Sequence, residues 1–542
     1  MQFVSVLGLF TLLGVAWAMS YHRHAIRMRP IVWGIGLQFL FALIILRNDY
    51  WSFVGMGLFA ALLTVYMTQK QAVVQRRGWL AMAAIIATGA IAAVVASELL
   101  AGYLGWLLMI LVLVLIANSR FDLKPQWQGF GGALFVMVGV AWFVTHDLHG
   151  QRLFQGISAN VSSFLSLSDY GAKFLFANLA DPQYFGPNAE GTWPGFGFLF
   201  AFKVLPTIVF FGGFMAVLYY LGIMQKVILA MSRFMRWTIG TSGAETLSCS
   251  ANIFVGQTEA PLLIKPFLDG MTRSELLTVM VGGFSTIAGG VLAGYIAMGI
   301  DAGYLIAASV MSAPAALVIA KIIFPELEKS QTAGEVHMPA IESGSNVVEA
   351  ATAGISDGLR LAVNVGAMLL GFIALIAVLD LILNWLDARI DGDFLGGVYH
   401  TYATSAGMSP INGEFSGIFP GSLQTLFGTI LKPLAWLMGV PWADAGKVGN
   451  LLGIKLSLNE FVAYGTLGTY MHAGVLSERA ILISTCALCG FANFSSIGIQ
   501  IGGISALAPG RRADLAKVGL KAMFGGALAS WLTATIAGIL LA

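Results

Sequence analysis

Apolar runs of about twenty residues recur along the whole chain, and they restrict its fold more than any other feature. A helix needs about 20 apolar residues to cross the ~30 Å hydrocarbon core of a bilayer. Hydrophobic residues make up 58% of the sequence and charged residues only 10%, whereas a soluble domain carries about 25% charged residues. We therefore expect an all-α membrane protein that crosses the bilayer many times. The runs lie near 2–19, 31–47, 51–68, 79–97, 99–117, 129–145, 196–222, 276–299, 303–324, 360–385, 479–507 and 518–541.

The basic residues indicate how the chain is oriented. Arg23 and Arg27 follow the first run rather than precede it, which favours a retained helix over a signal peptide. Counting the runs places the other basic loops on that same side, which should be the cytoplasm. This predicts that both termini face the outside; the acidic loop 325–358 is the one segment that does not fit the pattern.

Net charge and cysteine usage exclude several classes of protein. A net charge of +2 is too small to indicate a nucleic-acid partner. Cys486 and Cys489 form a Cys-x-x-Cys pair inside an apolar run, without a second pair or a nearby histidine. We interpret them as small residues that pack between helices rather than as a metal or redox site.

The second half of the chain contains an internal repeat. The segment "MRWTIGTSGAETLSCSANIFVGQTEA" ends in Glu259, and "LAWLMGVPWADAGKVGNLLGIKLSLNEF" ends just beyond Glu460. Each is followed by Ser-Glu and then by an apolar helix that is interrupted, at "GGFSTIAGG" (282–290) and at "CGFANFSSIG" (489–498). The span count makes the two copies enter from opposite sides. This is the pattern of an inverted repeat, in which the substrate site lies at the midplane between broken segments.

The polar residues of the broken segments indicate the chemistry of the substrate. A carboxylate at the centre of a bilayer costs about 2.5–3.5 kcal/mol or more, so Glu259 and Glu460 should face a cavity or a partner. The neighbouring polar groups are amides and hydroxyls without a Lys or Arg, which suits a neutral solute rich in such groups. They are Gln257, Thr258, Ser285, Thr286, Asn459, Asn493, Ser495 and Ser496.

Two further features admit two interpretations each. Phe491 either offers an apolar face to a flat ring or packs against another helix. Asn252 and Thr286 are either helix caps or oxygen ligands for a hard cation such as Na⁺ at an unwound helix.

At these residues the sequence resembles the concentrative nucleoside transporter family. The motifs are "FAFKVLPTIVFFGGFMAVLYYLGIMQ", "ANIFVGQTEAPLLIKPF", "MTRSELLTVMVGGFSTIAGGVLAGYIAMG", "LNEFVAY" and "GFANFSSIGIQIGGI". The resemblance covers about 150–542 continuously, and residues 1–47 also resemble the usual bacterial N-terminus of the family. Extra apolar runs between 51 and 145 depart from the short bacterial form.

The resemblance implies a homotrimer in the inner (plasma) membrane, with a scaffold domain and a moving transport domain. The transport domain should contain two re-entrant helical hairpins, near 226–266 and 424–466, and two unwound helices, near 274–300 and 478–505. The implied divisions are 1–50 (N-terminal scaffold helices), 51–145 (extra peripheral helices), 146–225 (an interfacial helix and a scaffold helix), 226–300 (first half of the transport domain), 301–385 (scaffold helices), 386–423 (external loop), 424–505 (second half of the transport domain) and 506–542 (C-terminal helix).

The resemblance also implies roles for individual residues. Gln257, Thr258 and Glu259 match the residues that read the nucleobase, and Val291 and Phe491 match its apolar contacts. The residues that match the holders of the ribose hydroxyls are Glu460, Asn493 and Ser496. The coupling ion Na⁺ would bind the side chains of Asn252 and Thr286 and the carbonyls of Val255 and Ile287.

The favoured hypothesis is therefore a secondary transporter that imports nucleosides, such as uridine, together with Na⁺. Two alternatives remain at this point: a proton replaces Na⁺, or the two acids form an intramembrane hydrolase pair. The sequence has no nucleophile motif and no Walker-type loop, which argues against catalysis and against an ATP-driven pump. It does not rank purine against pyrimidine nucleosides.

Overall fold

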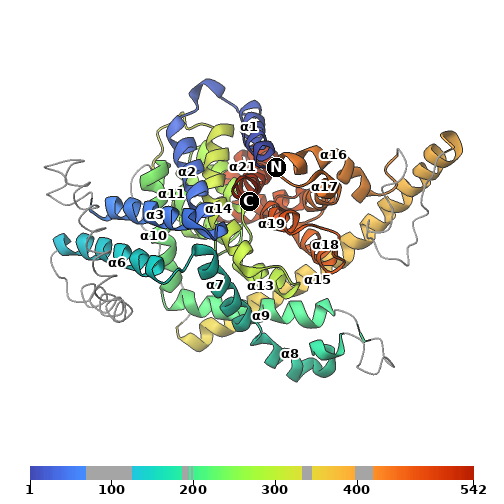
Figure 1. The fold of residues 1–542 in the computed structure, drawn as a ribbon, viewed down its shortest axis with the longest axis horizontal. Helices are drawn as coiled ribbons and strands as arrows, with labels where there is room; N and C mark the ends of the chain where they lie inside the picture. Colours follow the sequence, from blue (N-terminus) through green and yellow to red (C-terminus); the bar gives the residue numbers. More distant parts are fainter. Residues whose placement is uncertain (69–124, 186–194, 197–198, 333–344, 397–418, 542) are drawn as a thin grey trace. The chain divides into compact units, whose positions relative to one another are not determined.

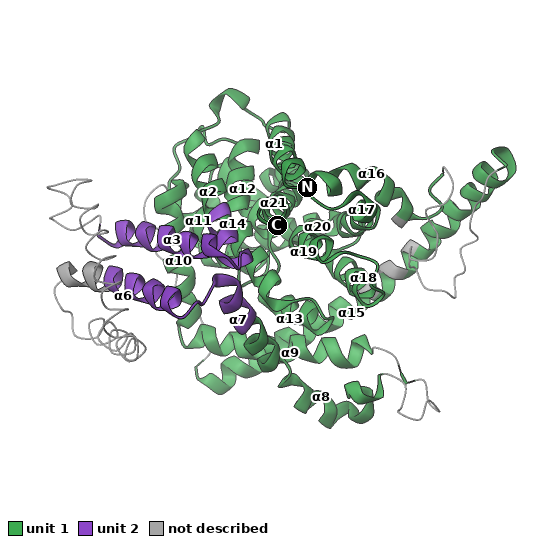
Figure 2. Ribbon diagram, in the orientation of Figure 1, with its two compact units in different colours: residues 1–38, 158–542 green, residues 39–157 purple. Residues whose placement is uncertain are grey.

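The computed structural model describes residues 1–68, 125–185, 195–196, 199–332, 345–396 and 419–541 (Figure 1). Within these ranges every regular element is helical and no strand occurs, as the sequence predicts. The chain divides into two compact units, one formed by residues 1–38 and 158–542 and the other by residues 39–157 (Figure 2).

The smaller unit contains two apolar helices, α3 (Tyr50–Thr68) and α6 (Pro125–Thr145), that pack against each other. Ser52 at the start of α3 holds two other segments of this unit together. Its hydroxyl donates to the Ile44 carbonyl at 3.0 Å and accepts from the Gly150 amide at 2.9 Å. The predicted runs 51–68 and 129–145 are thus helical. The predicted runs 79–97 and 99–117 lie outside the described residues.

Long helices form the framework of the larger unit. They are α1 (Gln2–Ala18), α2 (Met28–Leu46, which continues into the smaller unit), α9 (Phe200–Tyr220), α14 (Ala302–Ile323), α15 (Val347–Asp387) and α21 (Arg512–Leu540). Helix α21 packs against α1 and α14, and nearly every residue from 522 to 538 is buried. Helix α15 packs along α9; its 41 residues make it roughly 60 Å long, about twice the thickness of a hydrocarbon core.

Six of the described helices are long and apolar enough to cross a membrane, or eight if two sharply bent helix pairs each count as one span. This agrees with the multi-pass membrane protein that the apolar runs predict. The predicted span 360–385 is longer than expected, because α15 begins at Val347, where the Asn346 side chain caps it by accepting from the Glu349 amide at 2.9 Å. The helical conformation also continues, through a π turn at Ala388–Phe394, into the predicted external loop.

Amphipathic helices accompany the apolar ones. The segment 146–195, for which the sequence predicts an interfacial helix, contains the amphipathic helix α7 (Gly150–Leu165) followed by α8 (Ser168–Phe176). Two more amphipathic helices, α10 (Ile223–Ile239) and α16 (Leu423–Leu437), stand directly before the two hairpins.

The two hairpins begin later than the sequence predicts. The first consists of α11 (Gly243–Ala251), a tip and the 3₁₀ segment η4 (Ala260–Gly270). The second consists of α17 (Trp442–Ser457) and α18 (Glu460–His472). The expected ranges 226–266 and 424–466 merge each hairpin with most of the amphipathic helix before it. In the structure the chain turns between each amphipathic helix and its hairpin. Before the first hairpin, a capping box of Ser242 and Glu245 starts the new helix α11. Before the second, α16 and α17 meet at 117°.

Both predicted unwound helices are confirmed. The first is broken between α12 (Arg273–Ser285) and α13 (Gly289–Ala297), and the second between α19 (Glu478–Leu488) and α20 (Phe494–Leu507). In the second helix, side-chain caps define where each part begins: the Ser477 hydroxyl accepts from the Ala480 amide at 3.3 Å, and the side-chain carbonyl of Asn493 accepts from the Ser496 amide at 2.8 Å.

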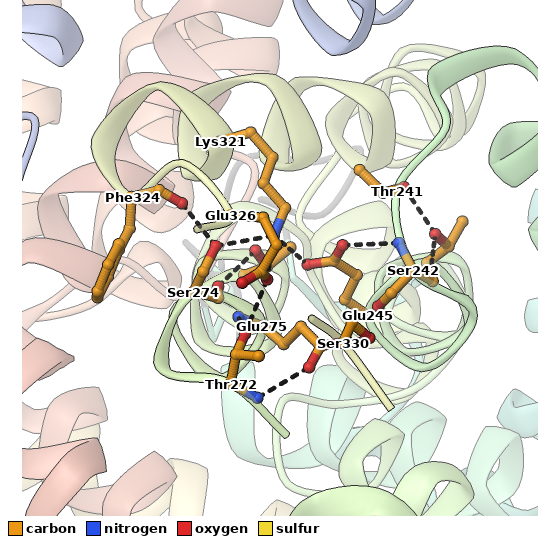
Figure 3. Close-up of polar contacts among 12 residues, drawn as sticks. Thr241, Ser242, Glu245, Thr272, Ser274, Glu275, Lys321, Phe324, Glu326 and Ser330 are labelled. Atoms are coloured by element: carbon orange, nitrogen blue, oxygen red, sulfur yellow. Dashed lines mark hydrogen bonds and ion pairs between the residues drawn. The ribbon is translucent and has the colours of Figure 1, made fainter. Parts of the chain in front are cut away.

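A buried polar cluster holds the base of the first hairpin (Figure 3). Lys321 near the end of α14 pairs with Glu245 at 2.6 Å and donates to the Ser274 hydroxyl at 2.9 Å. Glu275 accepts from three donors at 2.6–2.8 Å, namely the Thr272 amide and the hydroxyls of Ser330 and Thr332. Because buried charges need full pairing, this cluster fixes the starts of α11 and α12 against α14.

Candidate functional site

A cavity of about 420 Å³ lies where the two hairpin tips and the two helix breaks meet. All eight residues that the sequence analysis assigns to substrate binding line it: Gln257, Thr258, Glu259, Val291, Glu460, Phe491, Asn493 and Ser496. These residues come from segments up to 239 positions apart, as the Gln257–Ser496 contact shows. No Lys or Arg is among the described residues that line the cavity.

The tip of the first hairpin presents a carboxylate to the cavity. The chain turns at Gly256, and the Gly256 amide donates to Glu259 Oε2 at 2.8 Å, which fixes the side chain of Glu259 against its own turn. Thr258 packs closely against α20, because a Cβ placed at Gly503 would lie 2.8 Å from the methyl carbon of Thr258. The short turn before Pro261 therefore explains why a carboxylate occurs within this apolar segment.

The tip of the second hairpin presents the other carboxylate. Glu460 is only 4% exposed and accepts from the Tyr295 hydroxyl at 3.0 Å and from the Asn493 amide at 3.5 Å. Tyr295 is itself fully buried and packs against the rings of Phe461 and Tyr464. Helix α13 of the first repeat thus positions the acid of the second.

The start of α20 orients polar groups toward the same cavity. Asn493 Oδ1 accepts from the Ser495 hydroxyl at 2.7 Å as well as from the Ser496 amide at 2.8 Å. The positive end of the α20 dipole lies at these residues, and it favours oxygen-rich groups nearby. The arrangement suits a ligand that presents hydroxyl groups to Glu460 and Asn493.

The tip of the first hairpin also meets the first helix break. The Gly289 amide donates to the Phe254 carbonyl at 3.0 Å, and a Cβ placed at Gly282 would lie 3.2 Å from Asn252 Nδ2. Asn252 is 1% exposed, and neither the oxygen nor the nitrogen of its side-chain amide has a hydrogen-bond partner in the described part of the chain. Thr286 is also buried, and its hydroxyl donates to the carbonyl of the same Gly282 at 3.0 Å.

The predicted sodium ligands fit this environment. The carbonyls of Val255 and Ile287 accept no hydrogen bond from the residues that the structure describes. Together with the unpaired amide of Asn252 and the hydroxyl of Thr286, they offer four oxygen atoms, and oxygen is the ligand that hard cations prefer. A buried polar group without a partner destabilises the fold, so a cation here would satisfy an unmet requirement.

At the second helix break, a lysine side chain provides the hydrogen bonds that the backbone carbonyls need. Lys455 at the end of α17 is fully buried, and its ammonium donates to the Ala487 carbonyl and to the Ser530 hydroxyl at 2.8 Å each, and to the Cys489 carbonyl at 3.5 Å. A cation at the C-terminal end of α19 interacts favourably with the helix dipole. Cys489 and its neighbour Cys486 are buried free thiols.

Four polar residues of or beside the site were not predicted from the sequence. Asn364 of α15 lines the cavity, Tyr295 binds Glu460, Gln500 lies behind Gln257, and Lys455 caps α19. The sequence could have indicated three of them, Asn364, Gln500 and Lys455, because an amide or ammonium group within an apolar span is energetically costly unless it has a specific partner. Nothing in the sequence could have indicated Tyr295, since a tyrosine in an apolar helix is common.

A cavity between two hairpins and two broken helices of an inverted repeat defines the class, which is that of the secondary membrane transporters. Models of the Na⁺ dependent nucleoside transporter family match the chain over residues 7–72 and 104–179 (N-terminus) and 304–538 (C-terminus), and a model described as nucleoside recognition matches 201–302. The chain therefore belongs to the Na⁺-dependent, concentrative nucleoside transporter family.

Individual relatives agree with this assignment. An uncharacterized transporter of Haemophilus influenzae is 43% identical, over 82% of this chain and 98% of its own length. The nucleoside permease NupC of Helicobacter pylori is 39% identical, over 80% of this chain and 95% of its own. Sodium/nucleoside cotransporter 1 of Mus musculus is 40% identical over 80% of this chain, but only 62% of the mouse protein is covered.

Solved structures show the same fold. CNTnw in an inward-facing, substrate-bound state matches with a TM-score of 0.70 and 33% identity, over 99% of this chain and 98% of that one. Variants of CNTnw in outward-facing and intermediate states match equally well. Since this is a family of transporters and not of enzymes, the hydrolase alternative is not supported. Within the predicted extra segment 51–145, only 73–103 is left unmatched by the family model.

Proposed function

We propose that this protein is a secondary active transporter that imports nucleosides by symport with Na⁺. The observation that carries this proposal is the shared position of two sites. The cavity with its two carboxylates adjoins, through the tip of the first hairpin, a buried Asn252 that lacks a partner among the described residues. A ligand in the cavity and a cation beside Asn252 would both contact the segment from 252 to 259.

The cavity groups divide into two sets that match the two parts of a nucleoside. Gln257, Thr258 and Glu259 would bind the base, whose faces would contact Val291 and Phe491. The ribose hydroxyls would bind the second set, which is Glu460, Asn493 and Ser496. The absence of Lys and Arg among the described lining residues favours a neutral nucleoside over a nucleotide, whose phosphates need positive partners.

The cation would couple to the nucleoside through the first hairpin. Na⁺ bound by Asn252, Val255, Thr286 and Ile287 would join the tip to the first helix break and favour the closed hairpin. A closed hairpin binds the nucleoside more tightly, and by reciprocity the nucleoside tightens Na⁺ binding by the same factor. A proton in place of Na⁺ is the alternative, because Glu259 lies within the same tip.

The remaining assignments follow the family resemblance. We propose a homotrimer in the inner (plasma) membrane, in which a scaffold containing α9 and α15 stays fixed while the hairpins and broken helices move as the transport domain. Alternating access needs such a movement around one site. Helix α15 carries apolar side chains more than half exposed, such as Leu370 at 77% and Val363 at 58%, which a lipid or a second subunit would cover.

We expect Asn252→Ala to weaken the Na⁺ dependence of uptake before it weakens nucleoside binding. The substitution removes one of four proposed oxygen ligands but leaves the cavity groups in place. In proteoliposomes, the Na⁺ concentration for half-maximal uptake of labelled uridine should rise about tenfold or more, since a hydrogen-bond or ligand contact to a charge contributes about 1.5–3 kcal/mol. At saturating Na⁺, uridine binding should stay within a few-fold of the unmodified protein.

A matched control is Asn450→Ala, which removes another fully buried asparagine, one bonded to the Tyr470 hydroxyl at 2.7 Å and distant from the proposed ion site in sequence. It should leave the Na⁺ dependence unchanged. If uptake by the unmodified protein is indifferent to Na⁺ but rises steeply as the external pH falls, the sodium site is wrong and proton coupling takes its place.

A further inference from the structure

Gln500 is a buried amide that no part of the proposed mechanism uses. It lies on α20 with no exposed surface, one turn after Ser496. Its Nε2 donates to Gln257 Oε1 at 3.0 Å and to the Met280 carbonyl at 3.2 Å. Because an amide nitrogen has two N–H groups, both donors of Gln500 are occupied.

This chain of hydrogen bonds has a single consistent direction. The Met280 carbonyl can only accept, so the atom of Gln500 that faces it must be the nitrogen and not the oxygen. The same nitrogen then faces Gln257, whose amide must present its oxygen to it. Gln257 Nε2 is thereby turned to the opposite side, where it donates to the Ser496 hydroxyl at 3.3 Å. Its second N–H makes no hydrogen bond within the described part of the chain, and Gln257 lines the cavity.

The helix that faces Gln500 leaves room for this contact. A Cβ placed at Gly283 of α12 would lie 2.7 Å from Gln500 Nε2 and 2.9 Å from the Cβ of Gln257. Only a glycine permits the two glutamines to meet at that depth, because real Cβ atoms do not approach neighbours within 3.0 Å. The backbone carbonyl, the glycine and both amides thus form one built arrangement.

We propose that Gln500 is a positioning residue that fixes the amide of Gln257 with its NH₂ group toward the substrate. The transporter would then select a base that carries a hydrogen-bond acceptor, such as a carbonyl oxygen, at the position facing Gln257. Without Gln500, the Gln257 amide can turn over and offer either its donor or its acceptor. This inference rests on the proposed function, because it assumes that Gln257 contacts the base.

Gln500→Met tests the proposal, since methionine fills a similar volume but cannot donate. The measurement is competition against labelled uridine on the purified full-length protein, with uridine, 2-thiouridine and 4-thiouridine as competitors. Both analogues keep the N3–H and replace one carbonyl oxygen by sulfur, which accepts hydrogen bonds weakly. We expect the unmodified protein to bind one of the two analogues roughly tenfold more weakly than uridine, and Gln500→Met to reduce that ratio to about twofold.

Ile504→Met is the control, because Ile504 lies one turn further along α20, is equally buried and does not line the cavity. Ile504→Met should keep the roughly tenfold preference for uridine over the disfavoured analogue that is expected of the unmodified protein, because a general disturbance of the helix does not change which base is preferred. In Gln500→Asn the amide is withdrawn by one methylene. This variant should also bind uridine and the disfavoured analogue with affinities within about twofold of each other, and it replaces Gln500→Met if that variant does not fold.

Two results would overturn the inference while leaving nucleoside transport intact. One is a ratio in Gln500→Met equal to that of the unmodified protein. The other is equal binding of uridine and both thio analogues by the unmodified protein, which would mean that Gln257 reads neither oxygen. Failure of the unmodified protein to bind uridine at all would instead contradict the proposed function.

Discussion

Glu460→Ala is expected to lower nucleoside affinity about 10- to 150-fold and to abolish uptake at low substrate concentrations. A hydrogen bond to a charged group contributes about 1.5–3 kcal/mol, and the loss of Glu460 also leaves the buried Tyr295 hydroxyl and the Asn493 amide without their partner. Glu259→Ala should have a similar effect from the other hairpin tip. Calorimetric titration of the purified variants with uridine measures the change.

Glu478→Gln is the matched control, because this acid is exposed in the first turn of α19 and does not line the cavity. Its uptake should equal that of the unmodified protein. Size-exclusion chromatography should show that all three variants assemble normally. Near-normal uridine binding by Glu460→Ala would refute the assignment of this carboxylate to the substrate.

Gly490→Ala is expected to destabilise the protein and to reduce uptake by more than tenfold. Gly490 has a φ of +124°, and a Cβ there would lie 2.5 Å from the Phe284 carbonyl oxygen and 2.7 Å from the Ser285 carbonyl carbon. The two helix breaks therefore meet backbone to backbone at this residue. The collision should cost about 1–3 kcal/mol, and the backbone strain about 1–3 kcal/mol more.

The thermal midpoint of the purified, nucleoside-free protein measures this destabilisation. Gly498→Ala on the following helix is the control, because no atom lies within 4 Å of the Cβ position there. Alanine should raise the stability of that helix slightly, by up to about 1 kcal/mol. Equal midpoints for Gly490→Ala and Gly498→Ala would show that the breaks do not depend on their close contact.

The sequence predicts the cavity well because its two carboxylates would be energetically costly in contact with lipid. Glu259 and Glu460 each stand within apolar segments, and the lipid around such a segment leaves only a cavity or a partner for a carboxylate. The repeat then relates the two acids, and the family resemblance supplies the roles of their neighbours. All eight residues that the sequence assigns to substrate binding consequently line one cavity.

The features that the sequence did not predict depend on contacts between distant segments. Tyr295 binds an acid 165 positions later, and Gln500 binds an amide 243 positions earlier. No local pattern contains such a pairing. The predicted range of the second hairpin includes the helix before it for a different reason. Apolarity continues from α16 into α17, and the 117° turn between these two helices depends on backbone geometry that hydropathy does not report.

The most direct test of Na⁺-coupled nucleoside import is uptake of labelled uridine into proteoliposomes with Na⁺ and pH varied separately. With one Na⁺ per nucleoside, a potential of ~100 mV supplies roughly 2.3 kcal/mol, and a tenfold Na⁺ gradient adds roughly 1.4 kcal/mol. We predict that an inward Na⁺ gradient with an inside-negative potential concentrates uridine at constant pH, up to a limit of about 500-fold. Accumulation driven by a pH gradient alone, and unchanged when choline replaces Na⁺, would contradict the account.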